Sequence, residues 1–170
     1  MDGAELRALQ APLKTRYREA PETALVPAQA EATLDFANVA CEVTAGGRAV
    51  TAGLHPAAGG DGTRACSADM LLAALAACAG VTLTAVASAM GLAVRGGRIV
   101  AVGTWDARGT LGVDRSVPVG LAEISLTFEL DTEAEPAALE RLVATTERYC
   151  VILQTLRAPP RVSVVSKRTN

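Results

Sequence analysis

Aromatic residues are scarce in this sequence. They make up 3% of the 170 residues, although half of the chain is apolar. A hydrophobic core must therefore be built mainly from Ala, Val and Leu. The length suits one domain with such a core, and no internal repeat is evident. We predict an N-terminal helix and linker at residues 1–28, followed by a single domain at residues 29–170.

A surplus of either charge is also missing. The chain has 16 basic and 18 acidic residues, which gives a formal net charge of −2. Proteins that hold nucleic acids by their phosphates usually carry a strongly basic surface, and this composition does not provide one. We therefore expect no nucleic acid among the partners.

An export signal and a metal-binding motif are absent as well. The N-terminus lacks the basic start, apolar block and cleavage site of a secretory signal, so we expect a cytoplasmic protein. Cysteines in such a protein are more often free thiols than structural disulfides. Cys41, Cys66, Cys78 and Cys150 form no CxxC pair, and His55 is the only histidine. Zinc sites usually need four such ligands with some close in sequence, so we expect neither a metal nor a cofactor.

The stretch from Met70 to Met90 contains no charged residue. About twenty apolar residues are long enough to span a bilayer. Small residues dominate this stretch, however, and no aromatic residue marks a membrane interface at either end. A helix buried within a soluble protein, in its core or at a subunit contact, explains the stretch better, and we expect no membrane partner.

Short alternating segments bounded by glycine and proline predict six strands. They lie at residues 30–35, 39–44, 48–54, 98–106, 123–130 and 161–166. Gly46 and Gly47 predict a hairpin between the second and third strands, because glycine tolerates the positive φ of a tight turn. A second, glycine-rich hairpin is expected around Gly109 and Gly112. The strand at 123–130 alternates most clearly, which indicates a sheet with one buried face.

Three helices are predicted. One covers residues 1–20, and another covers 67–90 with Ser67 as its N-cap and Gly91 at its end. A third begins at Pro136 and carries an apolar stripe at helical spacing, formed by Leu139, Leu142, Val143, Thr146, Cys150 and Leu153. The fold class is therefore α+β, with largely antiparallel strands around a long apolar central helix.

Two of the cysteines lie on apolar faces of predicted helices. Cys78 is in the middle of the uncharged helix and Cys150 is on the stripe of the later one, so the two thiols could meet across the core. Buried cysteines often only fill space, and apolar surroundings make a thiol inert. The residues alone therefore leave packing and redox chemistry both open. Cys41, Cys66 and His55 lack any accompanying motif, and core or surface roles suffice for them.

Two segments resemble the signatures of the OsmC/Ohr family, which includes osmotically inducible proteins and organic hydroperoxide resistance proteins. SADMLLAALAACAGVTL, at residues 67–83, is similar to the helix that carries the family's peroxide-reactive cysteine. ERYCVI, at residues 147–152, resembles the later helix with its partner cysteine. The agreement extends over nearly the whole chain after residue 28, with features of a divergent OsmC-like member.

The resemblance implies an OsmC-like fold in an intertwined homodimer with active sites at the subunit interface. It implies that Cys78 attacks an organic hydroperoxide and becomes a sulfenic acid, which Cys150 converts to a disulfide. An external dithiol reductant would then restore both thiols. The alternatives are a non-catalytic dimer of this fold that binds a small apolar ligand, and a purely structural dimerisation domain.

The sequence departs from the family pattern around the reactive cysteine. Val151 stands where a proline often follows the second cysteine, and Ala68 and Asp69 replace the usual acidic arrangement before the first. The family's arginine lies on an early strand loop, and the matching residues 36–38 contain none. Because a thiol among apolar groups needs help to ionise, we expect a cation to reach Cys78. The candidates are Arg16, Arg18, Arg64, Arg148 and Arg157.

Overall fold

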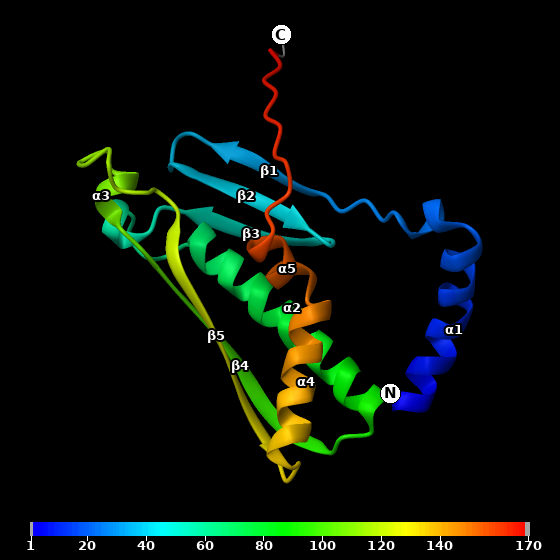
Figure 1. Ribbon diagram of the computed structural model, residues 1–170. Helices are drawn as coiled ribbons and strands as arrows, with labels where there is room; N and C mark the ends of the chain where they lie inside the picture. Colours follow the sequence, from blue (N-terminus) through cyan, green and yellow to red (C-terminus); the bar gives the residue numbers. More distant parts are fainter. Residues whose placement is uncertain (1, 169–170) are drawn as a thin grey trace.

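The computed structural model describes residues 2–168 (Figure 1). Its helices are α1 (Gly3–Glu19), α2 (Ser67–Met90), α3 (Ala107–Thr110), α4 (Pro136–Tyr149) and α5 (Val151–Arg157), with one-turn 3₁₀ helices at Pro21–Ala24 and Pro56–Ala58. Its strands are β1 (Ala30–Asp35), β2 (Ala40–Ala45), β3 (Arg48–Gly53), β4 (Val94–Trp105) and β5 (Leu121–Thr132). The predicted α+β class is confirmed.

The strands form two antiparallel sheets. One sheet has three strands in the order β1-β2-β3, and the other pairs β4 with β5. The hairpin predicted between β2 and β3 is confirmed, with φ angles of 56° at Gly46 and 75° at Gly47. Such paired positive angles match the right-handed twist of the two flanking strands.

The core lies where α2, α4 and α5 meet the β4–β5 sheet (Figure 1). Its fully or nearly fully buried residues are small or aliphatic, namely Leu75, Ala79, Leu83, Ala87, Leu142 and Cys150. Phe128 is the aromatic residue packed against both buried clusters. The expectation of a core with little aromatic content is therefore confirmed.

Helix α2 is less buried than its sequence predicts. Only four of its residues are buried, and they follow one another at intervals of one turn. On another face of the helix, Val81 is 71% exposed. By length and composition α2 is apolar enough to cross a membrane, but the core helix of a soluble protein passes the same test. The exposed, uncharged surface of α2 is suited to a contact with another subunit.

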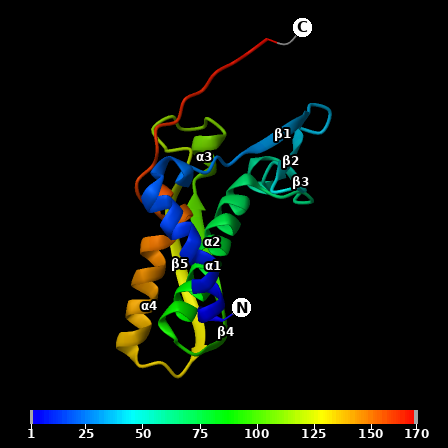
Figure 2. The ribbon, with the colours of Figure 1, turned by 90° about the vertical axis from the view of Figure 1, so that its right-hand side faces the viewer.

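The three-stranded sheet projects from this core (Figure 2), and α1 lies to one side of it (Figure 1). Every residue of β1 is exposed, and α1 has no buried residue. The bounds of β1 and α1 nonetheless agree with the predicted ones to within a few residues. The division of the chain at residue 28 remains a prediction.

Two local predictions are wrong, and a third is confirmed with a different connection. Cys66, not Ser67, occupies the N-cap position of α2, and its side chain makes no capping hydrogen bond. The hairpin expected around Gly109 and Gly112 is confirmed by the antiparallel pairing of β4 with β5, but its connection contains the short helix α3, because the Asp106 carboxylate accepts the N–H of Arg108 and starts a helical turn. Residues 161–166 are extended but pair with no strand among the described residues, since no strand edge of the same chain lies beside them.

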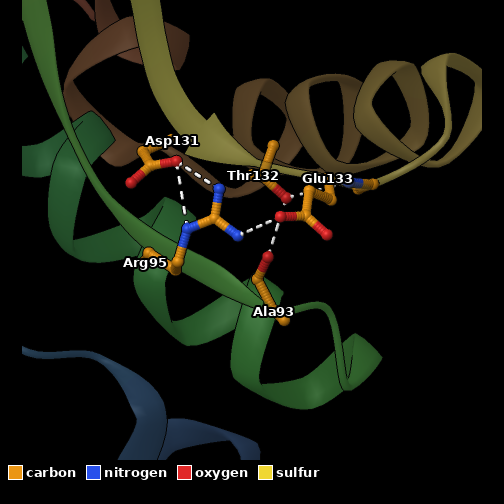
Figure 3. Close-up of polar contacts among 6 residues, drawn as sticks. Ala93, Arg95, Asp131, Thr132 and Glu133 are labelled. Carbon is orange, nitrogen blue, oxygen red and sulfur yellow. Dashed lines mark hydrogen bonds and ion pairs between the residues drawn. The ribbon is translucent and has the colours of Figure 1, made fainter.

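Strand β4 begins at Val94, before its predicted start, and its register with β5 is irregular between Val94 and Gly96. A cluster of polar side chains spans the two strands at this point (Figure 3). Arg95 bonds the carboxylates of Asp131, at 2.6 Å, and Glu133, at 2.7 Å. All three side chains are more than half exposed, so the ion pairs orient the strand ends more than they stabilise them.

Gly97, beside this irregularity, is required by backbone geometry. Its φ is 151°, and a Cβ atom there would lie 2.3 Å from the carbonyl oxygen of Glu129. We expect Gly97→Ala to lower the free energy of unfolding by about 2 kcal/mol. Gly96→Ala is the matched control, because a Cβ atom at residue 96 meets nothing within 4 Å. Urea denaturation of both variants measures the difference, and equal stabilities would contradict this account of the strand.

Candidate active site

Cys78 and Cys150 meet in the core, as their placement on apolar faces suggests. Cys78 packs against the buried cluster of Leu75, Ala79 and Cys150, and each of the two thiols shifts the pKa of the other. Cys150 is fully buried, whereas Cys78 is partly exposed on α2. A small molecule can therefore reach the sulfur of Cys78 more readily than that of Cys150.

The helix predicted from Pro136 through Leu153 is broken at Cys150. Cys150 has φ −73° and ψ 105°, so α4 ends before it and α5 begins after it. Two contacts of residues in α5 with Glu147 bridge the break. The Gln154 side chain donates to the backbone carbonyl of Glu147 at 2.7 Å, and Arg157 pairs with its carboxylate at 2.9 Å. The prediction of one continuous helix is wrong because these local contacts stabilise two shorter ones.

The break directs free backbone N–H groups at the two sulfurs. The first N–H groups of any helix have no partner within it. In α5, the N–H groups of Ile152 and Val151 act to lower the pKa of Cys78, and those of Leu153 and Ile152 act to lower the pKa of Cys150. On the other side of Cys78, the Thr82 hydroxyl one turn later on α2 also donates to its sulfur. The site therefore supplies several neutral donors to one thiolate.

These donors determine how easily each thiol ionises. Burial raises the pKa of Cys78, but the N–H of Ile152, the Cys150 thiol, the N–H of Val151 and the Thr82 hydroxyl outweigh it, so the pKa lies below its ordinary value of 9.0. Burial raises the pKa of Cys150, and its neighbour Cys78 raises it further. Cys78 is thus the thiol that ionises first, and Cys150 keeps its proton and donates it in a hydrogen bond.

None of the groups that act most strongly on the Cys78 pKa is an arginine. Of the candidates, Arg157 pairs with Glu147, Arg64 donates to the backbone carbonyl of Asn38, and Arg16 and Arg148 lie over tyrosine rings of their own helices. The expected cation is replaced, within one chain, by backbone amides. Sequence reasoning missed them because no glycine or proline signals the break at Cys150.

Val151 allows a direct test of the amide donors. Proline is tolerated at the first position of a helix, and the extended backbone of Cys150 suits the residue before a proline. Val151→Pro therefore deletes one N–H donor with little other change. We expect it to raise the pKa of Cys78, so that the rate of iodoacetamide modification reaches half its maximum at a higher pH.

Val151→Ala is the matched control for this substitution, because it shortens the side chain and keeps the N–H group. Its pH profile should coincide with that of the unaltered protein. If the profile of Val151→Pro also coincides, the Val151 amide does not tune the Cys78 thiol.

The remaining polar candidates lie elsewhere. Cys41 is on β2 opposite Ala52, and Cys66 caps α2 at the end away from Gly91. The His55 ring packs edge-on against Trp105, with 5.4 Å between ring centres, and its Nδ1 accepts the N–H of Ala57. None of the three belongs to the cluster around Cys78 and Cys150.

A cavity of about 390 Å³ with a mixed polar and apolar lining adjoins the thiol cluster. It shares five residues with that cluster, namely Leu75, Leu126, Phe128, Leu153 and Leu156. The ion pair of Glu147 and Arg157 also lines it. Neither cysteine lines the cavity itself.

The family model of OsmC-like proteins matches residues 60–165, which is more than half of the chain and includes both cysteines. The chain belongs to the OsmC-like protein family. No curated protein matches the sequence itself. The low sequence identities given below agree with a divergent member of this family.

Solved structures show the same fold as this OsmC-like protein. An OsmC-like protein from Mycoplasma pneumoniae superposes with a TM-score of 0.67 at 17% identity, over 79% of this chain and 89% of that one. An organic hydroperoxide resistance protein from Elizabethkingia anophelis gives 0.64 at 14% identity, over 79% and 91%. The organic hydroperoxide resistance protein OhrB of Bacillus subtilis gives 0.53 at 21% identity, over 79% and 93%.

Proposed function

We propose that this OsmC-like protein is a cytoplasmic thiol peroxidase that reduces organic hydroperoxides through a dithiol–disulfide cycle of Cys78 and Cys150. The observation that carries the proposal is the contact of a thiol of lowered pKa with a second, proton-bearing thiol. A peroxidase cycle needs one sulfur that ionises and a neighbour that can condense with it. The names of the relatives from Elizabethkingia and Bacillus subtilis support hydroperoxides as the substrate class.

The proposed cycle has three steps. The Cys78 thiolate attacks the terminal oxygen of the hydroperoxide; the O–O bond breaks, and the alkoxide takes up a proton and leaves as an alcohol. Cys150 then loses its proton and attacks the sulfenic sulfur of Cys78, which forms the disulfide and releases water. An external dithiol reduces the disulfide by thiol exchange and is itself oxidised to a disulfide.

The surroundings of the thiols favour an apolar substrate. Leu75, Ala79 and Ile152 belong to the apolar cluster around the two cysteines, and the neighbouring cavity combines leucine and phenylalanine side chains with charged ones of Glu123, Glu147 and Arg157. An alkyl or aryl group gains free energy by leaving water for such surroundings, whereas hydrogen peroxide gains nothing comparable. We infer a preference for organic hydroperoxides over hydrogen peroxide.

We propose a homodimer as the functional form. A three-stranded sheet needs packing on at least one face, yet β1 is exposed along its whole length. The uncharged face of α2 around Val81 is also open, and it lies next to the exposed side of Cys78. A second copy that covers both surfaces would enclose the thiol pair.

Peroxide consumption by the unaltered protein tests the proposed function. With dithiothreitol in excess, we expect kcat/KM for cumene hydroperoxide to exceed that for hydrogen peroxide by about tenfold or more. Dithiols should support turnover much better than monothiols of similar pKa, because the second thiol resolves the mixed disulfide within one molecule. No consumption of either peroxide would refute the enzyme and leave ligand binding as the function.

A further inference from the structure

Cys150 is the only residue between α4 and α5. Its N–H donates to the carbonyl of Thr146 at 2.9 Å and closes the first helix, and its carbonyl accepts the N–H of Gln154 at 2.9 Å in the second. A joint of one residue leaves two backbone angles to set the direction of α5. The position of α5 beside the thiols therefore depends on what holds this joint.

Helix α5 is too short to hold its own position. It has seven residues, and all of them are exposed or partly exposed. Helices of this length are marginal in water and take their stability from contacts with other elements. Ile152, Leu153 and Leu156 pack against the cluster of the two thiols. Apolar packing of this kind is non-directional, so it keeps α5 close without fixing its direction.

Two polar side chains on another face of α5 reach back across the joint. Gln154 and Arg157 are three positions apart, so they lie on the same side of the helix. Both bind Glu147 of α4. The Gln154 side chain donates to the Glu147 backbone carbonyl at 2.7 Å, and the Arg157 guanidinium pairs with the carboxylate at 2.9 Å. Hydrogen bonds have a preferred direction, so these two links fix the angle that apolar packing leaves open.

Glu147, to which both links attach, is itself firmly placed. It follows Thr146, which is fully buried and whose hydroxyl donates to the carbonyl of Leu142 at 2.8 Å. The side chains of Glu147 and Arg157 are 37% and 55% exposed, so their ion pair contributes little to the stability of the whole fold. The links therefore matter for the direction of α5 more than for overall stability.

We propose that Gln154 and Arg157 are positioning residues, which hold the first turn of α5 against Cys78. Each acts through its bond to Glu147, and neither is among the groups that most strongly affect the thiol itself. Their effect on turnover rests on the proposed function. Their effect on the thiol does not, because thiol reactivity is measured without a peroxide.

Loss of the links should change the reactivity of Cys78 in one direction. Burial raises the pKa of this thiol, and the N–H groups of Ile152 and Val151 are among the groups that offset burial. When α5 is free to tilt, these N–H groups move away from the sulfur. The pKa of Cys78 should then rise, and a smaller fraction of the thiol is ionised and reactive at neutral pH.

Gln154→Leu in the full chain tests the proposal, because it removes one link without a change of charge. In the Cys66→Ser background, Cys78 is the one cysteine of the tryptic peptide 65–95, so iodoacetamide labelling of that peptide follows Cys78 alone. We expect the pH at which the labelling rate is half-maximal to rise by about half a unit or more. An unchanged pH would overturn the proposal.

Thr155→Val is the matched control on the same helix. The Thr155 hydroxyl donates to the Val151 carbonyl at 2.8 Å, so this bond lies within α5 and does not cross the joint. The pH of half-maximal labelling should stay within about 0.2 unit of that of the Cys66→Ser protein. A shift as large as that of Gln154→Leu would show that any loss of a bond in α5 has the same effect, which would also overturn the proposal.

Arg157 provides a second and independent test. Arg157→Met should raise the pH of half-maximal labelling, and Arg157→Lys should restore it, because lysine can still pair with Glu147. Arg148→Met is the control for lost charge, since Arg148 lies over the ring of Tyr149 and does not bridge the joint. Equal shifts in Arg157→Met and Arg148→Met would mean that charge and not position is responsible, and would overturn the role of Arg157.

Peroxide consumption by the unaltered protein separates this proposal from the proposed function. If the protein consumes no peroxide and the labelling profiles shift as expected, the function fails and the positioning role stands. If it consumes peroxide and all labelling profiles coincide, the positioning role fails and the function stands. Denaturation midpoints of the Gln154 and Arg157 variants should remain close to that of the unaltered protein, because both side chains are exposed.

Discussion

Replacement of Cys78 by serine should lower kcat/KM for cumene hydroperoxide by at least about a thousandfold, because a hydroxyl cannot replace the thiolate as a nucleophile at neutral pH. The variant should fold normally, since serine is close in size to cysteine and residue 78 is only partly buried. Dithiol-dependent peroxide consumption measures the effect, with denaturation midpoints recorded in parallel.

The controls for this substitution are Cys41→Ser and Cys66→Ser. Both residues lie outside the thiol cluster, so each variant should retain kcat/KM within about twofold. Unchanged consumption by Cys78→Ser would show that the chemistry takes place elsewhere. A large loss in Cys66→Ser instead would move the reactive thiol to the start of α2.

Replacement of Cys150 by serine should separate the two halves of the cycle. Cys78 keeps its amide donors in this variant, because the N–H groups of Val151 and Ile152 belong to α5 and not to the Cys150 side chain. The first turnover should therefore proceed, and the sulfenic acid on Cys78 should accumulate, since no neighbouring thiol can condense with it. Mass spectrometry after treatment with dimedone measures the trapped species.

The same dimedone treatment of Cys66→Ser should trap almost no sulfenic acid on Cys78, because Cys150 converts the sulfenic acid to a disulfide faster than dimedone reacts. If Cys150→Ser also traps none while peroxide is consumed, Cys150 is not the resolving thiol. If Cys150→Ser keeps full dithiol-dependent turnover, the external dithiol reduces Cys78 directly and the proposed disulfide is unnecessary.

Much of the fold follows from local patterns in the sequence. The ends of α2, the β2–β3 hairpin and the alternation of β5 are set by Gly91, by Gly46 and Gly47, and by apolar residues two apart. These signals act within a few residues, so the sequence predicts them well. The meeting of Cys78 and Cys150 was predictable as an option from the apolar faces of two helices. The two family signatures then singled out Cys78 and Cys150 as a redox pair.

The features that sequence reasoning missed depend on contacts between distant residues. The break at Cys150 has no proline or glycine, and it is supported by Gln154 and Arg157 reaching back to Glu147. The expectation of an arginine near Cys78 followed from the apolar neighbours of this thiol and from the arginine of the family pattern, and it took no account of N–H groups from another helix. Once α5 begins at Val151, its unpaired amides take the place of the cation.

The predicted strand at 161–166 illustrates the same dependence on partners. Its residues have strand character, but a strand forms only where an edge lies beside it. Among residues 2–168, no strand pairs with this segment. The open face of α2 is a further surface whose cover the single chain does not contain.

The oxidation state of Cys78 and Cys150 after one equivalent of cumene hydroperoxide tests the central claim most directly. The Cys66→Ser background is needed because trypsin leaves Cys66 and Cys78 in one peptide, residues 65–95. The account predicts that this peptide becomes disulfide-linked to residues 149–157, while Cys41 remains a free thiol. Peroxide left unconsumed with all thiols reduced, or consumed with oxidation confined to Cys41, would contradict it.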